Sequence, residues 1–384
     1  MTPEWPRSRV PDHLWIQYTA VPSDRPTRAP RRIAASTRHP RPPATRRRRP
    51  TAGMVVLELY YRGSEELTQL VSRVILPLHA RVGLSRVLLT YKGRPSADDN
   101  PREAQSLVSQ LPAAVAVSAV WSAKNAYVGS GKHARSGHET KEDATFAKFK
   151  SYNAALEAAG ARSILVVSGA GNKRSLDSVS TLQRAAATAP PTLPLGCVWN
   201  PHVGGVLDPY GGAEHREKEF ARLQQKLRSG VVHQCWISFG ADVDALQLGL
   251  ARLQAELRAI AAEAGGVTPA IALMGSVFVP SKAWIAKMRF RCWQGTYIGA
   301  NDDEDGWLSS VESATRISKQ VLQLYAEYGV EPVIESAVRT EKEVEQVVQL
   351  LATAATGASA SAAAAATTAG GAGGGLVAET EDVG

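Results

Sequence analysis

The chain of 384 residues is poor in cysteine, with only Cys197, Cys235 and Cys292. Their spacing matches no zinc-binding or redox motif, so neither a structural metal site nor a dithiol oxidoreductase motif is indicated. All three fall in or beside predicted strands, where a free thiol behaves as a small buried apolar side chain. This cysteine usage fits an intracellular, reducing compartment.

Long hydrophobic runs are also missing. No stretch of about 18 apolar residues occurs, so no membrane-spanning helix is expected. Acidic residues are scarce only at the start, because residues 1–53 hold twelve arginines, no lysine and three acids. This segment accounts for the whole net charge of +8, which leaves the rest of the chain near −1. A basic binding surface on the folded part is therefore not expected. The cluster Arg46–Arg49 leaves nucleic-acid binding by the first segment open as a minor alternative.

The first 53 residues are predicted to form a disordered Arg/Pro-rich extension or a transit peptide, and the sequence leaves both readings open. A transit peptide would place the protein in a mitochondrion or plastid, and a plain extension would leave it in the cytoplasm. The chain beyond Ala352 is a low-complexity tail rich in Ala and Gly. Residues 54–351 are the predicted folded domain, and nothing in the sequence indicates its oligomeric state.

Within this domain a short apolar strand followed by an amphipathic helix recurs along the chain. Several strands are continuous apolar runs, as expected for parallel strands covered on both faces. Eight such units predict a single (β/α)8 TIM barrel, whose chemistry lies at the carboxyl ends of the strands. The predicted strands are Val55–Tyr60, Arg86–Tyr91, Ala114–Trp121, Ser163–Ser168, Leu195–Asn200, His233–Phe239, Ala270–Val279 and Trp293–Ile298.

A long loop, Ser122–Asp143, interrupts the repeat after the third predicted strand. It contains three glycines and a polar charged set that includes Lys132 and His133. Loops of this length are usually functional lids or disordered insertions, and the sequence favours neither.

Several segments in barrel order resemble one enzyme family, the FAD-linked barrel of methylenetetrahydrofolate reductases. The similarity is spread over about Val55 to Val338 rather than concentrated in one motif. The segments that carry it are Leu165–Gly169 (LVVSG), Gly196–Pro201 (GCVWNP), Glu219–Gly230 (EFARLQQKLRSG), Ile237–Asp242 (ISFGAD), Gly275–Lys282 (GSVFVPSK) and Tyr325–Glu335 (YAEYGVEPVIE).

The resemblance implies a function in one-carbon metabolism that supports methionine biosynthesis. FAD would take hydride from NADH or NADPH and reduce 5,10-methylenetetrahydrofolate to 5-methyltetrahydrofolate. Glu58 matches the acid that protonates the folate substrate in this family. Burial of a carboxyl group among apolar residues raises its pKa, which suits a general acid. The alternative for Glu58 is a solvated acid paired with Arg62 or Lys92.

The same resemblance implies the cofactor contacts. Lys226 would contact the phosphates of FAD and Glu219 its ribose. These residues and Arg222 share one helix face, so an intrahelical ion-pair ladder is the alternative. The turn SGAGNKR after the fourth strand, with Ser168, Gly169 and Lys173, would approach the flavin through small residues and backbone N–H groups. Asn200 and His202 would contact the flavin after the fifth strand.

The chain departs from the family at three polar positions. Val120–Trp121 replaces a histidine at the end of the third strand, the turn SGAGNKR lacks an aspartate near the flavin, and Ser238 replaces a folate-binding glutamine. Ser238 and Trp121 are therefore the candidate substrate contacts, although a tryptophan there more often fills the core. Two alternatives follow: a non-catalytic barrel that has lost flavin binding, or a barrel that binds another phosphorylated ligand.

Overall fold

The computed structural model describes most of the predicted folded domain, between residues 54 and 352. Both terminal extensions and the loop residues Lys92, Lys173 and His133 lie outside the described residues. The described ranges are 54–90, 98–126, 132, 137, 140–169, 175–188, 191–208, 212–266, 270–290, 296–299 and 305–352.

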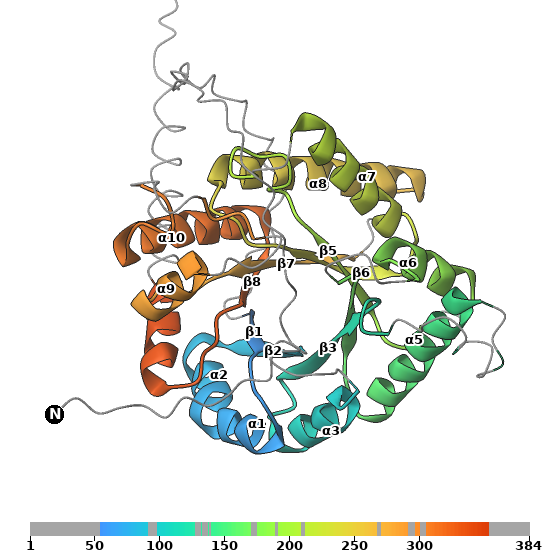
Figure 1. Cartoon of the computed structure of the whole chain (residues 1–384), viewed down its shortest axis with the longest axis horizontal. Coiled ribbons are helices and arrows are strands. Elements are labelled where there is room, and N and C mark those ends of the chain that lie inside the picture. Colours follow the sequence, from blue (N-terminus) through green and yellow to red (C-terminus); the bar gives the residue numbers. More distant parts are fainter. Residues whose placement is uncertain are drawn as a thin grey trace, which may run out of the picture. The chain divides into compact units, whose positions relative to one another are not determined.

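Eight parallel strands form a closed barrel in which each strand pairs with its neighbours in chain order (Figure 1). The strand β1 closes the ring by pairing with β8. The prediction of a (β/α)8 barrel is thus confirmed. The strands are β1 (Val55–Leu59), β2 (Leu84–Leu89), β3 (Ala116–Ser122), β4 (Ser163–Val167), β5 (Leu195–Trp199), β6 (Val232–Ile237), β7 (Ala272–Val277) and β8 (Glu331–Ile334).

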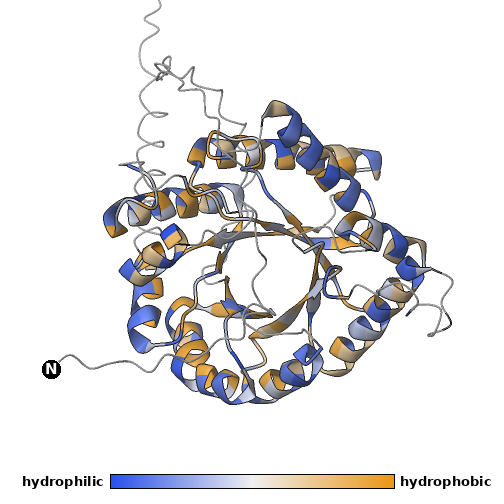
Figure 2. Ribbon diagram, viewed as in Figure 1, coloured by the Kyte–Doolittle hydropathy of each residue, from blue (hydrophilic) through white to orange (hydrophobic). Residues whose placement is uncertain are grey.

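Helices surround this ring, and they carry both hydrophobic and hydrophilic residues, as amphipathic helices do (Figure 2). Residues 341–352 are also helical. The other helices are α1 (Ser64–Leu70), η2 (Val71–Ile75), α2 (Leu76–Val82), α3 (Asn100–Gln110), α5 (Lys141–Ala158), α6 (Ser178–Ala187), α7 (Ala213–Leu227), α8 (Val243–Glu263), α9 (Lys282–Phe290) and α10 (Val311–Tyr328).

The eighth strand was predicted at the wrong place. In the described part of Trp293–Ile298, only Tyr297 makes a strand-like contact, an isolated bridge to Gly240. The strand that closes the barrel is β8, which pairs with β7 and β1. The sequence of β8 is only EPVI, and the proline and the glutamate in this short run hide its strand character.

Apart from irregularities at the starts of β1, β2 and β5, side chains alternate along the strands between an inner and an outer face. One buried cluster fills the barrel interior, and a larger one lies between the sheet and the helices. At Gly196 a side chain is excluded, because an added Cβ would lie 2.9 Å from Nε1 of Trp236. The interior cluster is Val56, Leu88, Val120, Leu165, Trp236, Met274 and Val333.

Below this apolar layer, near the amino ends of the strands, the interior is polar. Arg86 donates hydrogen bonds to Ser118 Oγ at 2.9 Å and to Ser163 Oγ at 2.8 Å. Burial raises the pKa of Glu331, and the nearby Arg86 guanidinium opposes that shift. The amino-terminal end is thus filled by its own side chains, which leaves the carboxyl ends of the strands as the place for a site.

Candidate functional site

The alternation of each strand decides which side chains reach the mouth of the barrel. Glu58, Ser122 and Ser276 are the last inward-facing residues of β1, β3 and β7, as the pairing register shows. By the same alternation, Asn200 and Ser238 follow β5 and β6 on the inner side. Glu58, Asn200 and Ser238 are therefore brought to one end of the barrel.

An acidic cluster lies where β8 meets β1. Leu57 pairs with Ile334, so the next residues along these strands, Glu58 and Glu335, are neighbours at the mouth. The Tyr60 hydroxyl forms a hydrogen bond with the Glu58 carboxylate. Burial, the two carboxylates and this bond together raise the pKa of Tyr60 well above its usual value. Tyr60 therefore stays protonated at neutral pH and serves as a hydrogen-bond donor to Glu58.

Glu335 and Tyr60 were not among the predicted site residues. Glu331, Val333 and Glu335 alternate at a period of two, which is the signal that places Glu335 on the inner face. That signal becomes readable only when β8 is located correctly. Tyr60 comes two residues after Glu58 and therefore lies on the same face of the chain. The same period of two would have identified Tyr60.

The end of β4 uses its polar groups for packing within the protein. The Ser168 hydroxyl donates to Ser178 Oγ at 3.0 Å and accepts from Ser178 N at 2.9 Å, so it caps the start of α6. Gly169 has φ +75°, and an added Cβ would lie 2.7 Å from Ser122 Oγ. The backbone thus passes close to β3 here, and the Ser168 hydroxyl is occupied by its two hydrogen bonds to Ser178.

His202 follows β5 and is 1% exposed. Among the described residues neither ring nitrogen has a hydrogen-bond partner. Burial lowers the pKa of His202 to about 4, although the nearby Asp242 carboxylate acts in the opposite direction. The ring packs on Gly240, where an added Cβ would lie 2.3 Å from the His202 Cγ. His202 is therefore a neutral, closely packed imidazole.

Ser122 carries a second buried polar atom of this kind, because its Oγ has no partner within the described part of the chain. Ser122 ends β3 and His202 follows β5, and these two strands lie on either side of β4. Unsatisfied buried polar groups cost stability and occur at sites where a ligand or water completes them.

Lys226 and Glu219 belong to α7, on the outer side of the sheet. Lys226 is 4% exposed, and its Nζ donates to the backbone oxygen of Val198 at 2.7 Å. The predicted ion-pair ladder is not formed either, since Arg222 instead bonds Asp177 at 2.9 Å. Neither Lys226 nor Glu219 is thus presented to the inner face of the mouth, where the predicted FAD contacts would lie.

Trp121 is likewise turned away from the mouth. It lies in the cluster between sheet and helices, and its ring meets Phe149 of α5 edge-on at 5.1 Å. The prediction of a substrate-stacking Trp121 is therefore wrong. Because side chains alternate along β3, the inward-facing Val120 and Ser122 leave Trp121 on the outer face.

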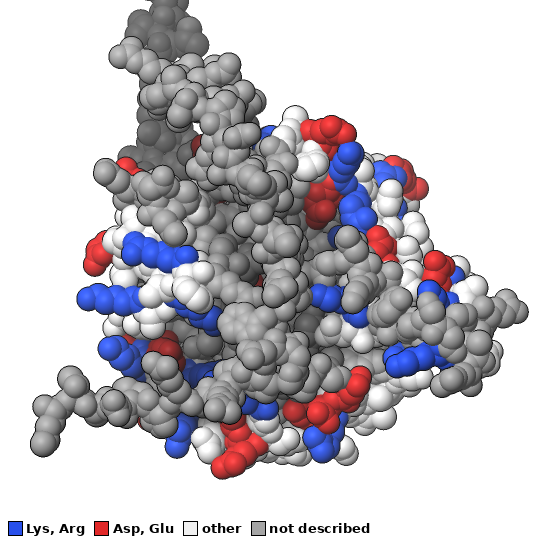
Figure 3. Space-filling model, in the orientation of Figure 1, with Lys and Arg blue, Asp and Glu red and all other residues white. Residues whose placement is uncertain are grey.

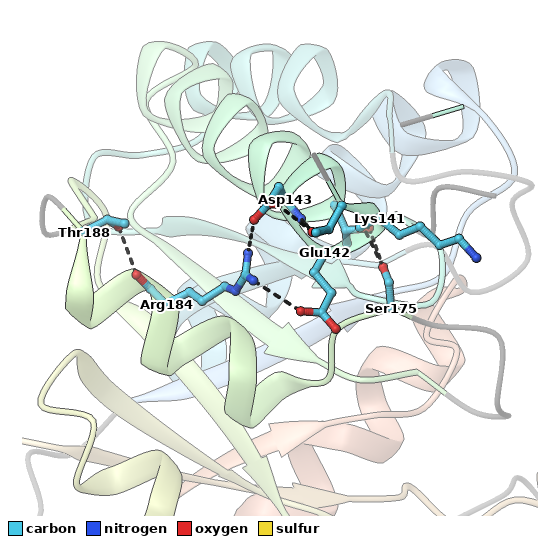
Figure 4. A network of polar contacts seen from close by, with 8 residues as sticks. Lys141, Glu142, Asp143, Ser175, Arg184 and Thr188 are labelled. Atoms are coloured by element: carbon cyan, nitrogen blue, oxygen red, sulfur yellow. Dashed lines mark hydrogen bonds and ion pairs between the residues drawn. The ribbon is translucent and has the colours of Figure 1, made fainter. Parts of the chain in front are cut away.

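A polar network joins the ends of two loops near the mouth (Figure 4). Arg184 of α6 binds Asp143 at 2.8 Å and Glu142 at 3.2 Å, at the start of α5. Thr145 and Ser175 share a hydrogen bond of 2.6 Å between their hydroxyls. The network fixes the first turn of α5 to α6. The loop before α5 leads into this network, and most of its residues lie outside the described part.

Charged side chains of both signs are interspersed over the helices in Figure 3. This distribution agrees with the near-zero charge of the predicted domain. Among the described residues, no group of three or more His, Cys, Asp or Glu side chains could hold a metal ion. No helix in the same part of the chain is long and apolar enough to cross a bilayer.

No protein-family model matches the chain, and no curated protein matches it. Solved structures with a similar fold include dihydropteroate synthase of Yersinia pestis, at 13% identity and a TM-score of 0.41 over 81% of this chain and 94% of that one. The Stenotrophomonas maltophilia dihydropteroate synthase gives 15% and 0.42 over 81% and 95%. An aldo-keto reductase of Klebsiella pneumoniae gives 10% and 0.40 over 77% and 84%. Likenesses this distant carry no argument about activity.

Proposed function

We propose that the chain is an enzyme that transfers a proton to or from a small molecule at the mouth of the barrel, with Glu58 as the acid–base group. The observation that carries this proposal is the acidic cluster of Glu58, Tyr60 and Glu335 at the end of β1 and β8. Glu58 is 6% exposed and lies above an apolar interior layer. Burying a carboxyl group costs folding free energy. Buried carboxyl groups in the mouth of a barrel are therefore candidates for functional groups.

The three side chains have different parts in this proposal. Tyr60 donates a hydrogen bond to Glu58 and fixes the direction of its carboxylate. Glu335 supplies a second carboxylate beside it, which adds negative charge at this end of the barrel. On the other side of the mouth, Ser122 and His202 offer buried polar atoms that a bound molecule would complete.

The reaction we propose is the reduction of 5,10-methylenetetrahydrofolate with NADH or NADPH as electron donor. It rests on the resemblance in sequence, in which the counterpart of Glu58 protonates the folate. The inward position of Glu58 supports this assignment. Ser238, also on the inner side, remains the proposed contact to the substrate.

FAD fits the described residues poorly. Lys226 and Glu219 are assigned to its phosphate and ribose by resemblance, yet both project from a helix outside the sheet, and the ammonium group of Lys226 is engaged by Val198. Ser168 is engaged by α6. We therefore derive no step through a flavin. This placement favours a second candidate, a barrel that keeps the fold without binding flavin.

The visible absorption spectrum of the full chain separates the two candidates. The protein is mixed with FAD, desalted and scanned, with Lys226→Met and the exposed Lys218→Met as a matched pair of variants. A retained two-banded flavin spectrum that only Lys226→Met loses would support the folate reductase and its FAD contact. A colourless protein would remove the flavin enzyme and leave the second candidate.

A further inference from the structure

Two cysteines face each other on adjacent strands, outside the site described above. Cys197 of β5 pairs in register with Cys235 of β6. Both belong to the cluster between sheet and helices, so their side chains leave the sheet on the same side. Neighbouring strands lie about 4.8 Å apart, which is within the Cα separation that a disulfide spans.

The surroundings of the pair distinguish one thiol from the other. Cys235 and Cys197 are hydrogen-bonded to each other, and this bond lowers the pKa of Cys197. The Lys226 ammonium group also lowers this pKa, whereas burial raises it. The same bond and burial raise the pKa of Cys235. Lys226 is a buried cation that α7 holds next to this pair through its bond to Val198. These contacts favour Cys197 over Cys235 as the thiol that reacts first, and the Glu219 carboxylate opposes ionisation of both.

We propose that Cys197 and Cys235 form a redox-modification site that closes to a disulfide with hydrogen peroxide, with Cys197 as the nucleophile and Lys226 as the group that stabilises its thiolate. Both thiols are fully buried, so the oxidant must be as small as peroxide and must enter during local opening of α7.

The reaction has two steps. The Cys197 thiolate attacks one peroxide oxygen, the O–O bond breaks, and the released hydroxide takes a proton to become water, which leaves a sulfenic acid. The Cys235 sulfur then attacks the Cys197 sulfur, the S–O bond breaks, and hydroxide leaves with the Cys235 proton as water. Two thiols are oxidised to one disulfide, and one peroxide is reduced to two waters.

The position of this site connects it to the mouth. Asn200 and Ser238 follow the two cysteines on the same strands, three residues later in each case. A disulfide would fix the spacing of β5 and β6 directly below these two side chains. The site itself does not depend on the function proposed for the mouth.

The test uses the full chain carrying Cys292→Ser, so that only the pair can react. After treatment with hydrogen peroxide, the protein is alkylated in denaturant and mapped by mass spectrometry. We expect a linked peptide pair containing Cys197 and Cys235, with a mass lower by two hydrogen atoms. In a Cys235→Ser variant, Cys197 should stop at a sulfenic acid that dimedone traps. Peroxide-treated protein in which both thiols still alkylate, or in which they oxidise without linking, would overturn the proposal.

The part of Lys226 is tested by rates. Lys226→Met should slow disulfide formation severalfold, because the Cys197 thiolate loses the neighbouring positive charge. Lys226→Arg keeps the positive charge and should keep the rate, which separates a charge effect from a packing effect. Equal rates for Lys226→Met and the unaltered protein would remove the lysine from the site.

Discussion

The buried histidine after β5 makes stability depend on pH in a defined direction. His202 is 1% exposed, and burial lowers its pKa from 6.5 to about 4. The unfolded chain therefore takes up a proton on this residue near pH 6.5, whereas the folded protein resists it until about pH 4. Because the unfolded state binds more protons in this window, the contribution to stability is complete above pH 6.5 and is lost as the pH falls through 4.

The magnitude follows from the shift. Each pKa unit corresponds to 1.36 kcal/mol, so the full effect is about 3 kcal/mol, of which about 2 kcal/mol is lost between pH 7 and pH 4.5. This is a sizeable fraction of the 5–15 kcal/mol by which domains are usually stable. Other titrating groups add their own pH dependence, so the effect of His202 is measured as a difference between variants.

The assay is denaturant unfolding at pH 7 and pH 4.5 of the unaltered protein, His202→Leu and the control His233→Gln. His233 is exposed on β6 and serves as the control for replacing a histidine at the surface. We expect His202→Leu to lose about 2 kcal/mol less than the unaltered protein between the two pH values. Equal losses in these two proteins would refute the assignment of His202 as a neutral buried imidazole.

Two further predictions concern packing. Gly275→Ala would place a Cβ 2.3 Å from the Tyr325 ring, so we expect a loss of at least about 1–3 kcal/mol in thermal or denaturant unfolding. Gly63→Ala is the control, because nothing lies within 4 Å of its added Cβ, and equal losses in both variants would contradict the contact. Arg86→Met should cost about 2–4 kcal/mol in the same assay, since it leaves Glu331 without its cation. If Arg86→Met combined with Glu331→Gln recovered no stability relative to Arg86→Met alone, the pairing would be wrong.

The sequence predicted the barrel because seven strands are apolar runs separated by amphipathic helices, a pattern that local residues largely determine. The eighth strand failed because EPVI is short and polar at its start, and its strand geometry depends on pairing with β7 and β1. Because β8 was misplaced, Glu335 was not predicted. Its inward position can be inferred only when it is known which residues of β8 face inward.

The site residues differ in the same way. The positions of some follow from the local sequence, and the positions of others depend on tertiary packing. The inward position of Glu58 follows from the alternation of side chains along β1, which the local sequence contains. Trp121 was assigned to the wrong face, since one residue along a strand reverses the direction of a side chain. Lys226 was expected at the mouth, yet its long side chain turns to Val198 within the layer between helix and sheet. Such a choice of partner depends on tertiary packing that spacing along a helix does not reveal.

Turnover measurements show whether Glu58 carries the proton transfer at the mouth. The full chain, Glu58→Gln and the exposed control Glu65→Gln are assayed anaerobically with methylenetetrahydrofolate, FAD and reduced nicotinamide. We expect product with the unaltered chain and with Glu65→Gln, and a loss of about 100-fold or more with Glu58→Gln, the usual contribution of a general acid. Equal rates with Glu58→Gln and the unaltered protein would contradict this role of Glu58, and an unaltered protein that forms no product would refute the folate reaction.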